Sequence, residues 1–405
     1  MTPPPAPVIE PPVTTKQAST AADVLRPAWV DVDLDALTAN LASMRRAVGP
    51  SKVLAVVKAD AYGHGSAPVS LALERAGVDW LGVALVEEGT WLRRAGVRAP
   101  ILVLGAVQPA QIPLFRRYDL VPTVSSLTQL GLWAEFARGG DGVQPLHLKI
   151  DTGMTRLGLA LDEVAEGLSL VRRHPQLALS GLLSHLADAD LLESPHNADQ
   201  HRRFDEVLAL LTPEERTSVT LHLANSAGAL HHEATRYSLV RLGLALYGLD
   251  PAAQALDLEP VMSVRARIVQ LRDVPAGTPL GYGGRRTTTR PSRIAVVPVG
   301  YADGYSWRLS DKADVLIHGR RIQVAGAVSM DMTLLDVTGT NAALGDEVVL
   351  MGRQESDRIT AAELALIAGT IPYELLCLLG LRMVRRYWQG GAIVDVRSRF
   401  MGSGL

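Results

Sequence analysis

The sequence predicts an α/β protein: a (β/α)8 barrel of the TIM type in the N-terminal part, followed by a mostly β domain. Short apolar runs of β type alternate with helically spaced segments between residues 53 and 241, as in parallel strands connected by helices. A linker-like stretch, residues 248–260, then contains Pro251 and Pro260. Beyond it the apolar residues follow the shorter period of antiparallel strands.

The barrel prediction depends on eight runs, each of a length typical of a buried strand. They are Val53–Lys58, Trp80–Ala84, Ile101–Leu104, Val121–Val124, Leu146–Ile150, Leu179–Ser184, Val219–Ala224 and Ser238–Arg241. Helical spacing fills the segments between them, as in Ser66–Ala76, and also precedes the first run at Leu34–Leu41, where Asp33 is a candidate cap.

The second domain contains further strands and two helical segments. The predicted strands are Val264–Leu271, Ile294–Val299, a hairpin over residues 315–326 with Gly319 at its turn, Thr333–Val337, Glu347–Met351 and Val394–Ser398. Ile359–Ala368 and Tyr373–Leu379 have helical spacing. The expected organisation is a disordered leader rich in Pro, Thr and Ala (1–27), the barrel (28–255) and the C-terminal β domain (256–405).

Composition narrows the class of protein. The formal charge of −2 over 405 residues gives no electrostatic reason to expect a nucleic acid or an anionic membrane as partner. The sequence lacks an apolar run of the roughly 18 residues that a membrane span needs, and it shows no secretory signal. The single cysteine, Cys377, has no partner for an internal disulfide. We therefore expect a cytoplasmic protein.

Lysine is scarce in this sequence, and two of its lysines stand out. Lysine occurs only at positions 16, 52, 58, 149 and 312, whereas arginine, which is abundant, cannot act as an amine nucleophile or base. The surroundings of Lys16, Lys52 and Lys312 indicate ordinary surface charges. Lys58 ends and Lys149 nearly ends a strongly apolar run, where an unpaired charge is costly.

Polar residues gather where the predicted strands end. Taken singly, each has a structural explanation: a strand-end lysine at the surface, a hydrogen-bonded core histidine, or a serine that caps a helix. Together they define the carboxyl-terminal rim of a barrel, where such enzymes bind ligands and commonly hold phosphate. The set comprises Lys58, Lys149, His185, Asn225, Ser226, Arg241, Gly243 and Leu244. The sequence thus predicts a site for a phosphorylated ligand.

Six segments, in order, resemble motifs of the alanine racemase family. They are AVVKADAYGHG at Lys58, LKIDTGMTRLG (148–158), HLANSAG (222–228), PVGYADGY (298–305), SMDMTLLD (329–336) and PYELLC (372–377). The resemblance extends from about residue 28 to the C-terminus. It implies a homodimer that binds pyridoxal 5'-phosphate (PLP), interconverts L- and D-alanine, and supplies D-alanine for peptidoglycan.

The resemblance also implies a role for each matching residue. Lys58 would bind PLP covalently and act as one base, and Tyr282, reaching the partner subunit's PLP, as the other. Arg241 would face the pyridine nitrogen, and His185 would connect it to Tyr282. The remaining expected site residues are Tyr62, Ser226, Gly243, Leu244 and Tyr373 around the phosphate, Arg156 at the substrate carboxylate, Lys149 as a carbamate that braces Arg156, and Tyr301, Met330 and Asp331 at the substrate access, contributed across the dimer.

Two bases suit the chemistry, because racemisation removes the Cα proton from one face and returns it to the other. The sequence departs from the family pattern at Leu242, where proline is frequent, and at Ser329, where cysteine is frequent; neither change removes a catalytic group. Three alternatives remain: a racemase of wider specificity for serine or basic amino acids, a PLP-dependent decarboxylase, and a non-catalytic PLP carrier. Arg156, Lys149 and Met330 argue against a widened pocket.

Overall fold

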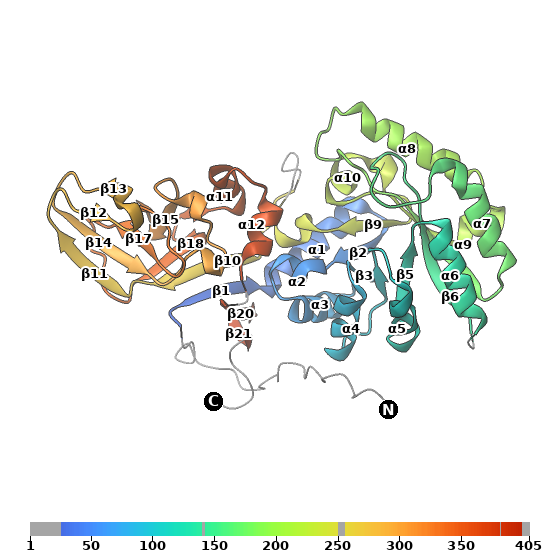
Figure 1. The fold of residues 1–405 in the computed structure, drawn as a ribbon, viewed down its shortest axis with the longest axis horizontal. Helices are drawn as coiled ribbons and strands as arrows, with labels where there is room; N and C mark the ends of the chain where they lie inside the picture. The colour runs from blue at the N-terminus through green and yellow to red at the C-terminus, as the bar shows by residue number, and fades with distance from the viewer. Residues whose placement is uncertain (1–25, 140–141, 250–255, 381, 399–405) are drawn as a thin grey trace. The chain divides into compact units, whose positions relative to one another are not determined.

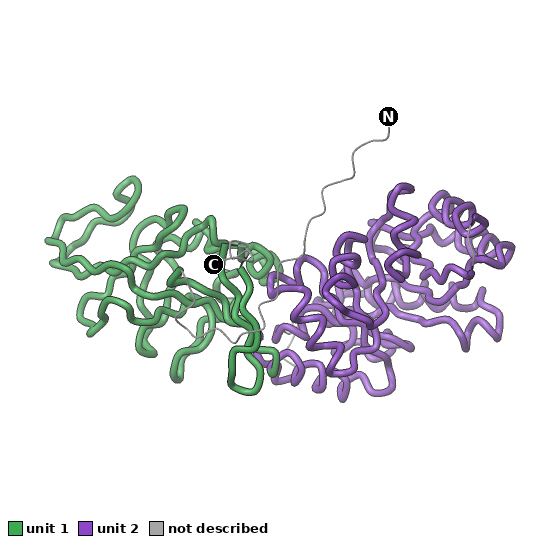
Figure 2. Tube along the Cα trace, turned by 90° about the horizontal axis from the view of Figure 1, so that it is seen from below, with its two compact units in different colours: residues 1–35, 262–405 green, residues 36–261 purple. Residues whose placement is uncertain are grey.

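The computed structural model describes residues 26–139, 142–249, 256–380 and 382–398. The chain divides into two compact units, one of residues 36–261 and one of residues 1–35 with 262–405 (Figure 2). Residues 1–25 of the expected leader and residues 250–255 of the expected linker lie outside the described residues.

The first unit is built on a parallel sheet of eight strands in the order β8-β7-β6-β5-β4-β3-β2-β9. Backbone hydrogen bonds between the segments of the two end strands, from Ser238 N to Leu221 O (3.2 Å) and from Arg241 N to Ala224 O (3.0 Å), bring the sheet close to a closed barrel. All eight predicted strands are confirmed. Their bounds are Lys52–Val56 (β2), Trp80–Val83 (β3), Ile101–Val103 (β4), Leu120–Val124 (β5), Gln144–Lys149 (β6), Leu177–Leu183 (β7), Thr220–His222 (β8) and Leu239–Leu242 (β9).

Helices lie around the outside of these strands (Figure 1). Side chains cap several of them: Asp33 Oδ1 accepts the amide of Asp35 as α1 begins, and Ser126 Oγ accepts the amide of Gln129 in α6. The helices are Leu34–Val48 (α1), Lys58–Tyr62 (α2), Ser66–Arg75 (α3), Val86–Arg94 (α4), Ile112–Arg117 (α5), Leu127–Arg138 (α6), Val164–Arg173 (α7), Pro195–Leu208 (α8), Pro213–Ser218 (α9) and Ser226–His231 (α10).

The second unit is mostly β. Its large sheet has the order β16-β15-β18-β10-β1-β20-β21, with β19 paired to β18, and two smaller sheets are β11-β14-β17 and β12-β13. The strands are Ala28–Asp33 (β1), Met262–Arg267 (β10), Gln270–Val274 (β11), Pro279–Leu280 (β12), Arg286–Thr287 (β13), Ser292–Val297 (β14), Asp314–Ile317 (β15), Arg320–Gln323 (β16), Thr333–Asp336 (β17), Glu347–Gln354 (β18), Asp357–Ile359 (β19), Val384–Gln389 (β20) and Ala392–Arg397 (β21). The helices are Ala361–Ala368 (α11) and Pro372–Leu378 (α12).

Local sequence signals predicted much of this unit correctly. The hairpin β15–β16 turns at His318 and Gly319, both with positive φ (49° and 67°), as a two-residue turn of the primed type requires. The prediction of one continuous strand at Val264–Leu271 is wrong, because the chain leaves one sheet after β10 and enters another at β11. The amide of Ile268 bonds to Asp346 O and the amide of Val269 bonds to Val296 O, so neighbouring residues join different sheets.

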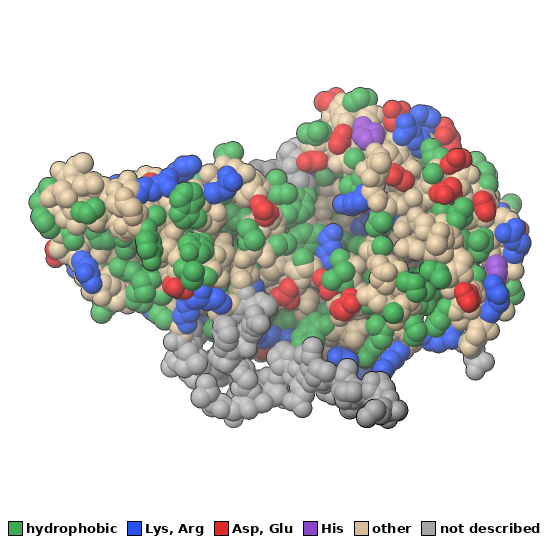
Figure 3. Space-filling model, in the orientation of Figure 1, with side chains coloured by type: hydrophobic (Ala, Val, Ile, Leu, Met, Phe, Trp, Pro, Cys, Tyr) green, Lys and Arg blue, Asp and Glu red, His purple; other side chains and the backbone are tan. Residues whose placement is uncertain are grey.

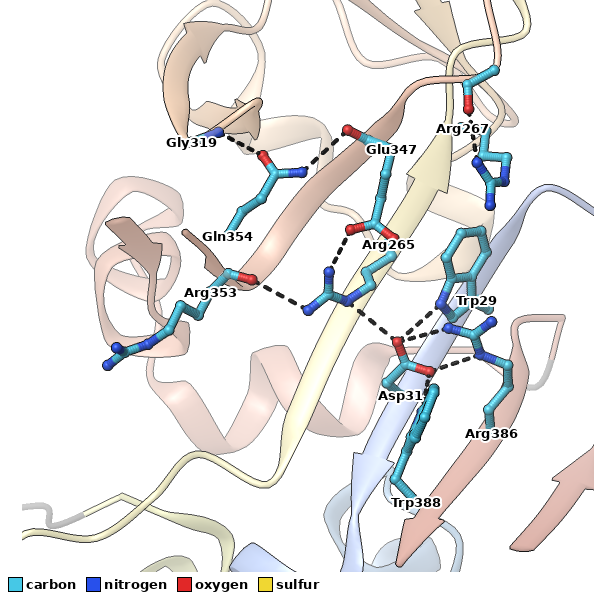
Figure 4. Close-up of polar contacts among 11 residues, drawn as sticks. Trp29, Asp31, Arg265, Arg267, Gly319, Glu347, Arg353, Gln354, Arg386 and Trp388 are labelled. Carbon is cyan, nitrogen blue, oxygen red and sulfur yellow. Dashed lines mark hydrogen bonds and ion pairs between the residues drawn. The ribbon is translucent and has the colours of Figure 1, made fainter. Parts of the chain in front are cut away.

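The first strand belongs to the C-terminal unit, whereas the sequence analysis had placed residues 28–35 in the barrel. β1 pairs antiparallel with β10 and parallel with β20. Asp31 on β1 joins the three strands (Figure 4): its carboxylate accepts hydrogen bonds from Arg386 Nε (2.7 Å) and Nη2 (2.9 Å), and Arg265 Nε lies 3.2 Å from it. The strands that pair with β1 lie more than 220 residues away in the sequence. The local period of apolar residues cannot reveal a pairing over that distance.

In the described part of the chain, no single helix is both long and apolar enough to cross a bilayer. Only α11 and α12 taken together, with a 98° bend between them, meet the criteria of length and composition.

Candidate active site

Lys58 lies two residues after the end of β2 and begins an unusual turn. Residues 59–62 all adopt left-handed backbone conformations, with φ between 53° and 54°. Such a conformation costs roughly 1–2 kcal/mol for each residue that has a Cβ. Glu88 on α4 holds the turn by accepting the amide of Ala59 (2.7 Å), and Asp60 Oδ1 accepts the amide of Ser66 (2.7 Å). Strain of this kind concentrates at functional sites.

Glu88 is a positioning residue that the sequence analysis did not identify. Its other carboxylate oxygen accepts the amides of Ala84 (2.7 Å) and Leu85 (3.1 Å), so one side chain ties the end of β3 to the turn after Lys58. Glu88 is the third residue of α4, the position of the acidic residue in a capping box, but Leu85 stands where such a box has Ser or Thr. The sequence therefore lacks the usual capping signal, and nothing local in it indicates the link to the Lys58 turn.

Arg241 on β9 lies inside the barrel with only 4 % of its surface exposed. Nη1 donates to His222 Nδ1 (3.1 Å) and to His222 O (2.9 Å). Nη2 donates to Ser184 O (2.7 Å), His185 Nδ1 (3.0 Å) and Leu223 O (2.8 Å). Every one of these acceptors is formally uncharged. Burial lowers the pKa of Arg241 to about 10, so the guanidinium remains a cation near neutral pH.

Further cationic groups surround Arg241 at the same end of the barrel. Lys149, at the end of β6, is 7 % exposed, and burial, Arg241, Arg156 and Lys58 together lower its pKa to about 8. Burial, followed by the same arginines and lysines, holds the pKa of His185 well below its ordinary value. The structure therefore brings these five predicted site residues into one electrostatic cluster. Positive charge gathered around the buried Lys149 and Arg241 favours an anionic ligand.

A cradle of hydroxyl and amide groups adjoins the end of β9. Ser226 Oγ, at the start of α10, accepts the amides of Gly243 (2.9 Å) and Ala245 (3.4 Å), which flank Leu244. The hydroxyl of Tyr62 approaches Gly243 so closely that a Cβ at this glycine would lie 2.7 Å from it. Hydroxyls and backbone amides are the donors that phosphate oxygens prefer. The cradle thus fits a phosphate group.

The other predicted site residues lie in the C-terminal unit. The turn at Tyr301 is fastened to the segment at Met330 by hydrogen bonds from Tyr301 N to Ser329 O and from Ala302 N to Met330 O, both 3.0 Å long. Arg382, which the sequence analysis missed, pairs with Asp331 at 2.8 Å. Tyr282 lies on the turn between β12 and β13, and Tyr373 lies at the start of α12.

Several of these side chains are large and exposed. Tyr282 is 78 % exposed, Met330 52 % and Tyr301 45 %. Figure 3 shows hydrophobic side chains among basic ones on the visible face of this unit. Exposed aromatic residues and methionines are more frequent at protein interfaces than elsewhere on a surface.

The fold and the barrel site define a class. The protein is a barrel enzyme of the type that carries its chemistry at the carboxyl ends of the strands, with a lysine amine, buried cations and a phosphate cradle side by side. Its β unit distinguishes it from proteins that consist of the barrel alone.

Comparisons with known families place the chain within this class. The alanine racemase N-terminal domain matches residues 32–251, and the alanine racemase C-terminal domain matches residues 261–387. The alanine racemase of Synechocystis is 42% identical over 356 residues, which cover 86% of this chain and 96% of the relative. That of Symbiobacterium thermophilum is 42% identical over 370 residues, 90% of this chain and 98% of the relative. The chain belongs to the alanine racemase family.

Solved structures of alanine racemases have the same fold as this chain. Alanine racemase of Clostridium difficile 630 superposes with a TM-score of 0.88 at 32% identity, covering 94% of this chain and all of that one (100%). A Bacillus anthracis alanine racemase with bound L-Ala-P gives 0.85 at 33% identity, covering 92% of this chain and 98% of that one. A Bartonella henselae alanine racemase with covalently bound pyridoxal phosphate gives 0.82 at 30% identity, with 89% and 99% covered.

Proposed function

We propose that this protein uses PLP to interconvert L- and D-alanine. The observation that carries the proposal is the cationic cluster of Lys58, Lys149, Arg156 and Arg241 beside the phosphate cradle, with Lys149 and Arg241 buried. These residues fit the cofactor, since PLP presents a phosphate, a carbonyl carbon that a lysine amine attacks, and a ring nitrogen. When bound, PLP supplies the electron sink that makes the Cα–H of an amino acid acidic.

Each part of the cofactor has a candidate partner in the chain. Lys58 would hold it covalently through Nζ, and Arg241 would face the ring nitrogen. Both terminal nitrogens of Arg241 already donate to protein acceptors, so among the described residues its Nε–H is the donor left for a ligand. The phosphate would be held by Tyr62, Ser226, Gly243, Leu244 and Tyr373.

The protons would be handled by two groups of this protein. Lys58 Nζ would take or return the Cα proton on one face, and the hydroxyl of Tyr282 on the other. Arg156 would bind the substrate carboxylate, and Tyr301, Met330 and Asp331 would border the substrate access. Arg241, still protonated near neutral pH, would donate a hydrogen bond to the ring nitrogen without giving up its proton.

We propose a carbamate at Lys149. Its amine is buried among like charges and has a pKa of about 8, so a substantial fraction is neutral near that pH and open to addition of carbon dioxide. Addition replaces a positive charge with a negative one, which turns the repulsion from Arg156 into attraction.

The functional assay is direct. Purified protein loaded with PLP is incubated with L-alanine, and D-alanine is followed with a coupled D-amino-acid oxidase. We expect D-alanine to form, and we expect serine and arginine, tested in parallel, to racemise much more slowly. Lack of conversion of any amino acid, with PLP bound, would favour a non-catalytic carrier. Equal rates for serine or arginine would favour the racemase of wider specificity.

We also propose that the enzyme is a homodimer whose sites combine one subunit's barrel with Tyr282 of the partner subunit. The support is the exposure of Tyr282, Tyr301 and Met330 on the C-terminal unit. Mixing a Lys58→Ala chain with a Tyr282→Phe chain tests this, because one of the two sites in each hybrid then keeps both bases. Activity should partly return. No recovery despite proven subunit exchange would contradict the shared site.

We place the enzyme in the cytoplasm, where it would supply D-alanine for peptidoglycan. Family membership supports this role, and the single cysteine, which cannot form an internal disulfide, agrees with a reducing compartment. Deleting the gene in its host should make growth depend on added D-alanine, and growth without it would contradict the role unless a second racemase is present.

A further inference from the structure

Two histidines that have no part in the proposed mechanism lie inside the barrel next to Arg241. His147 on β6 and His222 on β8 are both 0 % exposed, and His147 Nδ1 lies 2.9 Å from His222 Nε2. Bulky apolar residues usually fill this part of a barrel. The imidazole of His147 occupies space that Gly181 on β7 leaves open, since a Cβ at Gly181 would lie 2.3 Å from His147 Nδ1.

Arg241 decides where the protons of both histidines lie. A guanidinium only donates hydrogen bonds, so His222 Nδ1, 3.1 Å from Arg241 Nη1, accepts and carries no proton. Burial followed by the charge of Arg241 lowers the pKa of both imidazoles, that of His147 to about 3, so both are neutral. The one proton of His222 is therefore on Nε2, and it is donated to His147 Nδ1. His147 in turn carries its proton on Nε2.

This arrangement has a cost that packing does not explain. In the described structure His147 Nε2 is buried and has no hydrogen-bond partner, and an unsatisfied buried donor costs roughly 1–3 kcal/mol. An apolar side chain at position 147 would avoid that cost. What such a side chain would lack is the acceptor that His147 Nδ1 offers to His222.

We propose that His147 is a positioning residue: by accepting the proton of His222 Nε2, it holds the His222 ring in the orientation in which Nδ1 receives Arg241, and so holds the guanidinium in its ligand-binding orientation. The last part of the proposal rests on the proposed function, in which Arg241 faces the ring nitrogen of PLP. Without the acceptor at position 147, the Nε2–H of His222 would be buried without a partner. The ring then gains by turning toward another acceptor, and this turn takes Nδ1 away from Arg241.

Two substitutions of matched shape separate this role from packing. His147→Asn keeps an acceptor oxygen near the position of Nδ1, whereas His147→Leu places a methyl group there and is almost the same size. A purely structural role predicts that leucine is tolerated at least as well as asparagine, because position 147 is fully buried. The positioning role predicts the reverse order in kcat. His147→Met, with a flexible side chain that adapts to irregular cores, is a second apolar variant should His147→Leu fail to fold.

The first measurement does not depend on activity. Nitrogen-15 NMR of histidine-labelled protein, as purified, reports which nitrogen of each imidazole carries a proton, and His222→Gln assigns the His222 signals among the ten histidines. In the unaltered protein and in His147→Asn we expect a protonated Nε2 of His222 and, for Nδ1, the chemical shift of a nitrogen that accepts a hydrogen bond. In the apolar variants we expect the Nδ1 signal to move to the shift of a nitrogen without a donor. An unchanged Nδ1 signal of His222 in a folded apolar variant would overturn the proposal.

The second measurement is steady-state racemisation of alanine. Loss of the hydrogen-bond partner behind a ligand-binding group typically lowers activity roughly 10- to 100-fold. We expect such a fall in kcat for His147→Leu with KM for alanine little changed, and kcat near that of the unaltered protein for His147→Asn. Equal kcat values for the two variants would overturn the link to the reaction. If the unaltered protein has no racemase activity, the proposed function and that link fail together, whereas the NMR comparison still decides whether His147 holds the ring of His222.

Discussion

Asp31 is the acceptor at which strands β1, β10 and β20 of the C-terminal unit meet, and Asp31→Ala removes it. Its carboxylate accepts Arg386 Nε (2.7 Å) and Nη2 (2.9 Å), Trp388 Nε1 (2.7 Å) and Trp29 Nε1 (3.0 Å), with Arg265 Nε at 3.2 Å (Figure 4). The substitution leaves two guanidinium groups without this counter-charge.

The structure sets the size of the effect. Removing one partner of a buried ion pair costs about 3–5 kcal/mol. The side chain of Asp31 is 15% exposed and that of Arg386 is 10% exposed, so water screens the pair only slightly. Arg265 keeps its ion pair with Glu347, and Arg386 keeps its contact with the ring of Trp29 at 4.4 Å. These remaining contacts place the expected loss of unfolding free energy at the lower end, about 3 kcal/mol.

Urea denaturation followed by tryptophan fluorescence measures this loss, since Trp29 and Trp388 both contact Asp31. Protein concentration is held constant because subunit association contributes to apparent stability. The matched control is Asp273→Ala, which removes an exposed carboxylate from β11 of the same unit and should change stability by less than about 0.5 kcal/mol. If Asp31→Ala loses no more than this control, the reasoning about Asp31 is refuted.

Three further predictions concern the barrel site and its second base. Lys58→Ala should keep its fold by circular dichroism but lose the visible absorbance of lysine-bound PLP, and cofactor that borohydride still fixes covalently would identify another lysine. Because the pKa of Lys149 is lowered from 10.5 to about 8, the unmodified amine destabilises the fold less as pH rises from about 8 to 10.5. With carbon-13 bicarbonate, a carbamate NMR signal should grow from about pH 7 to 9 and be absent in Lys149→Ala. Absence of the signal from the unaltered protein would contradict the modification. Tyr282→Phe should lower racemisation by about 10²–10⁴ while Lys58 still exchanges the α-proton of D-alanine for deuterium; equal exchange from L-alanine would contradict the two-base assignment.

Much of the barrel follows from local sequence, because burial leaves a periodic trace. All eight barrel strands were predicted from apolar runs, since strands that are buried on both faces have few polar positions. The hairpin at Gly319 was equally predictable, because positive φ at a turn demands a particular residue. Residue types at strand ends also indicated a site for a phosphorylated ligand, and motif resemblance added the reaction.

Tertiary structure alone decided what depends on contacts between distant residues. β1 joined the C-terminal unit because Asp31 finds Arg386 across 355 positions of sequence, and no local pattern marks such a pair. The left-handed turn after Lys58 carries no sequence signal at Ala59 or Ala61, and contacts such as the one from Glu88 hold it.

The histidines beside Arg241 show the same division. His147 stands two residues before Lys149, so the period of a strand placed both side chains on one face. Which imidazole nitrogen carries a proton was set only by the contact between Arg241 and His222. Arg241 can only donate, so His222 Nδ1 must accept, and His222 Nε2 must then donate to His147 Nδ1. The sequence by itself thus determined the strands and the residue types at their ends, and the three-dimensional contacts determined how those residues are joined.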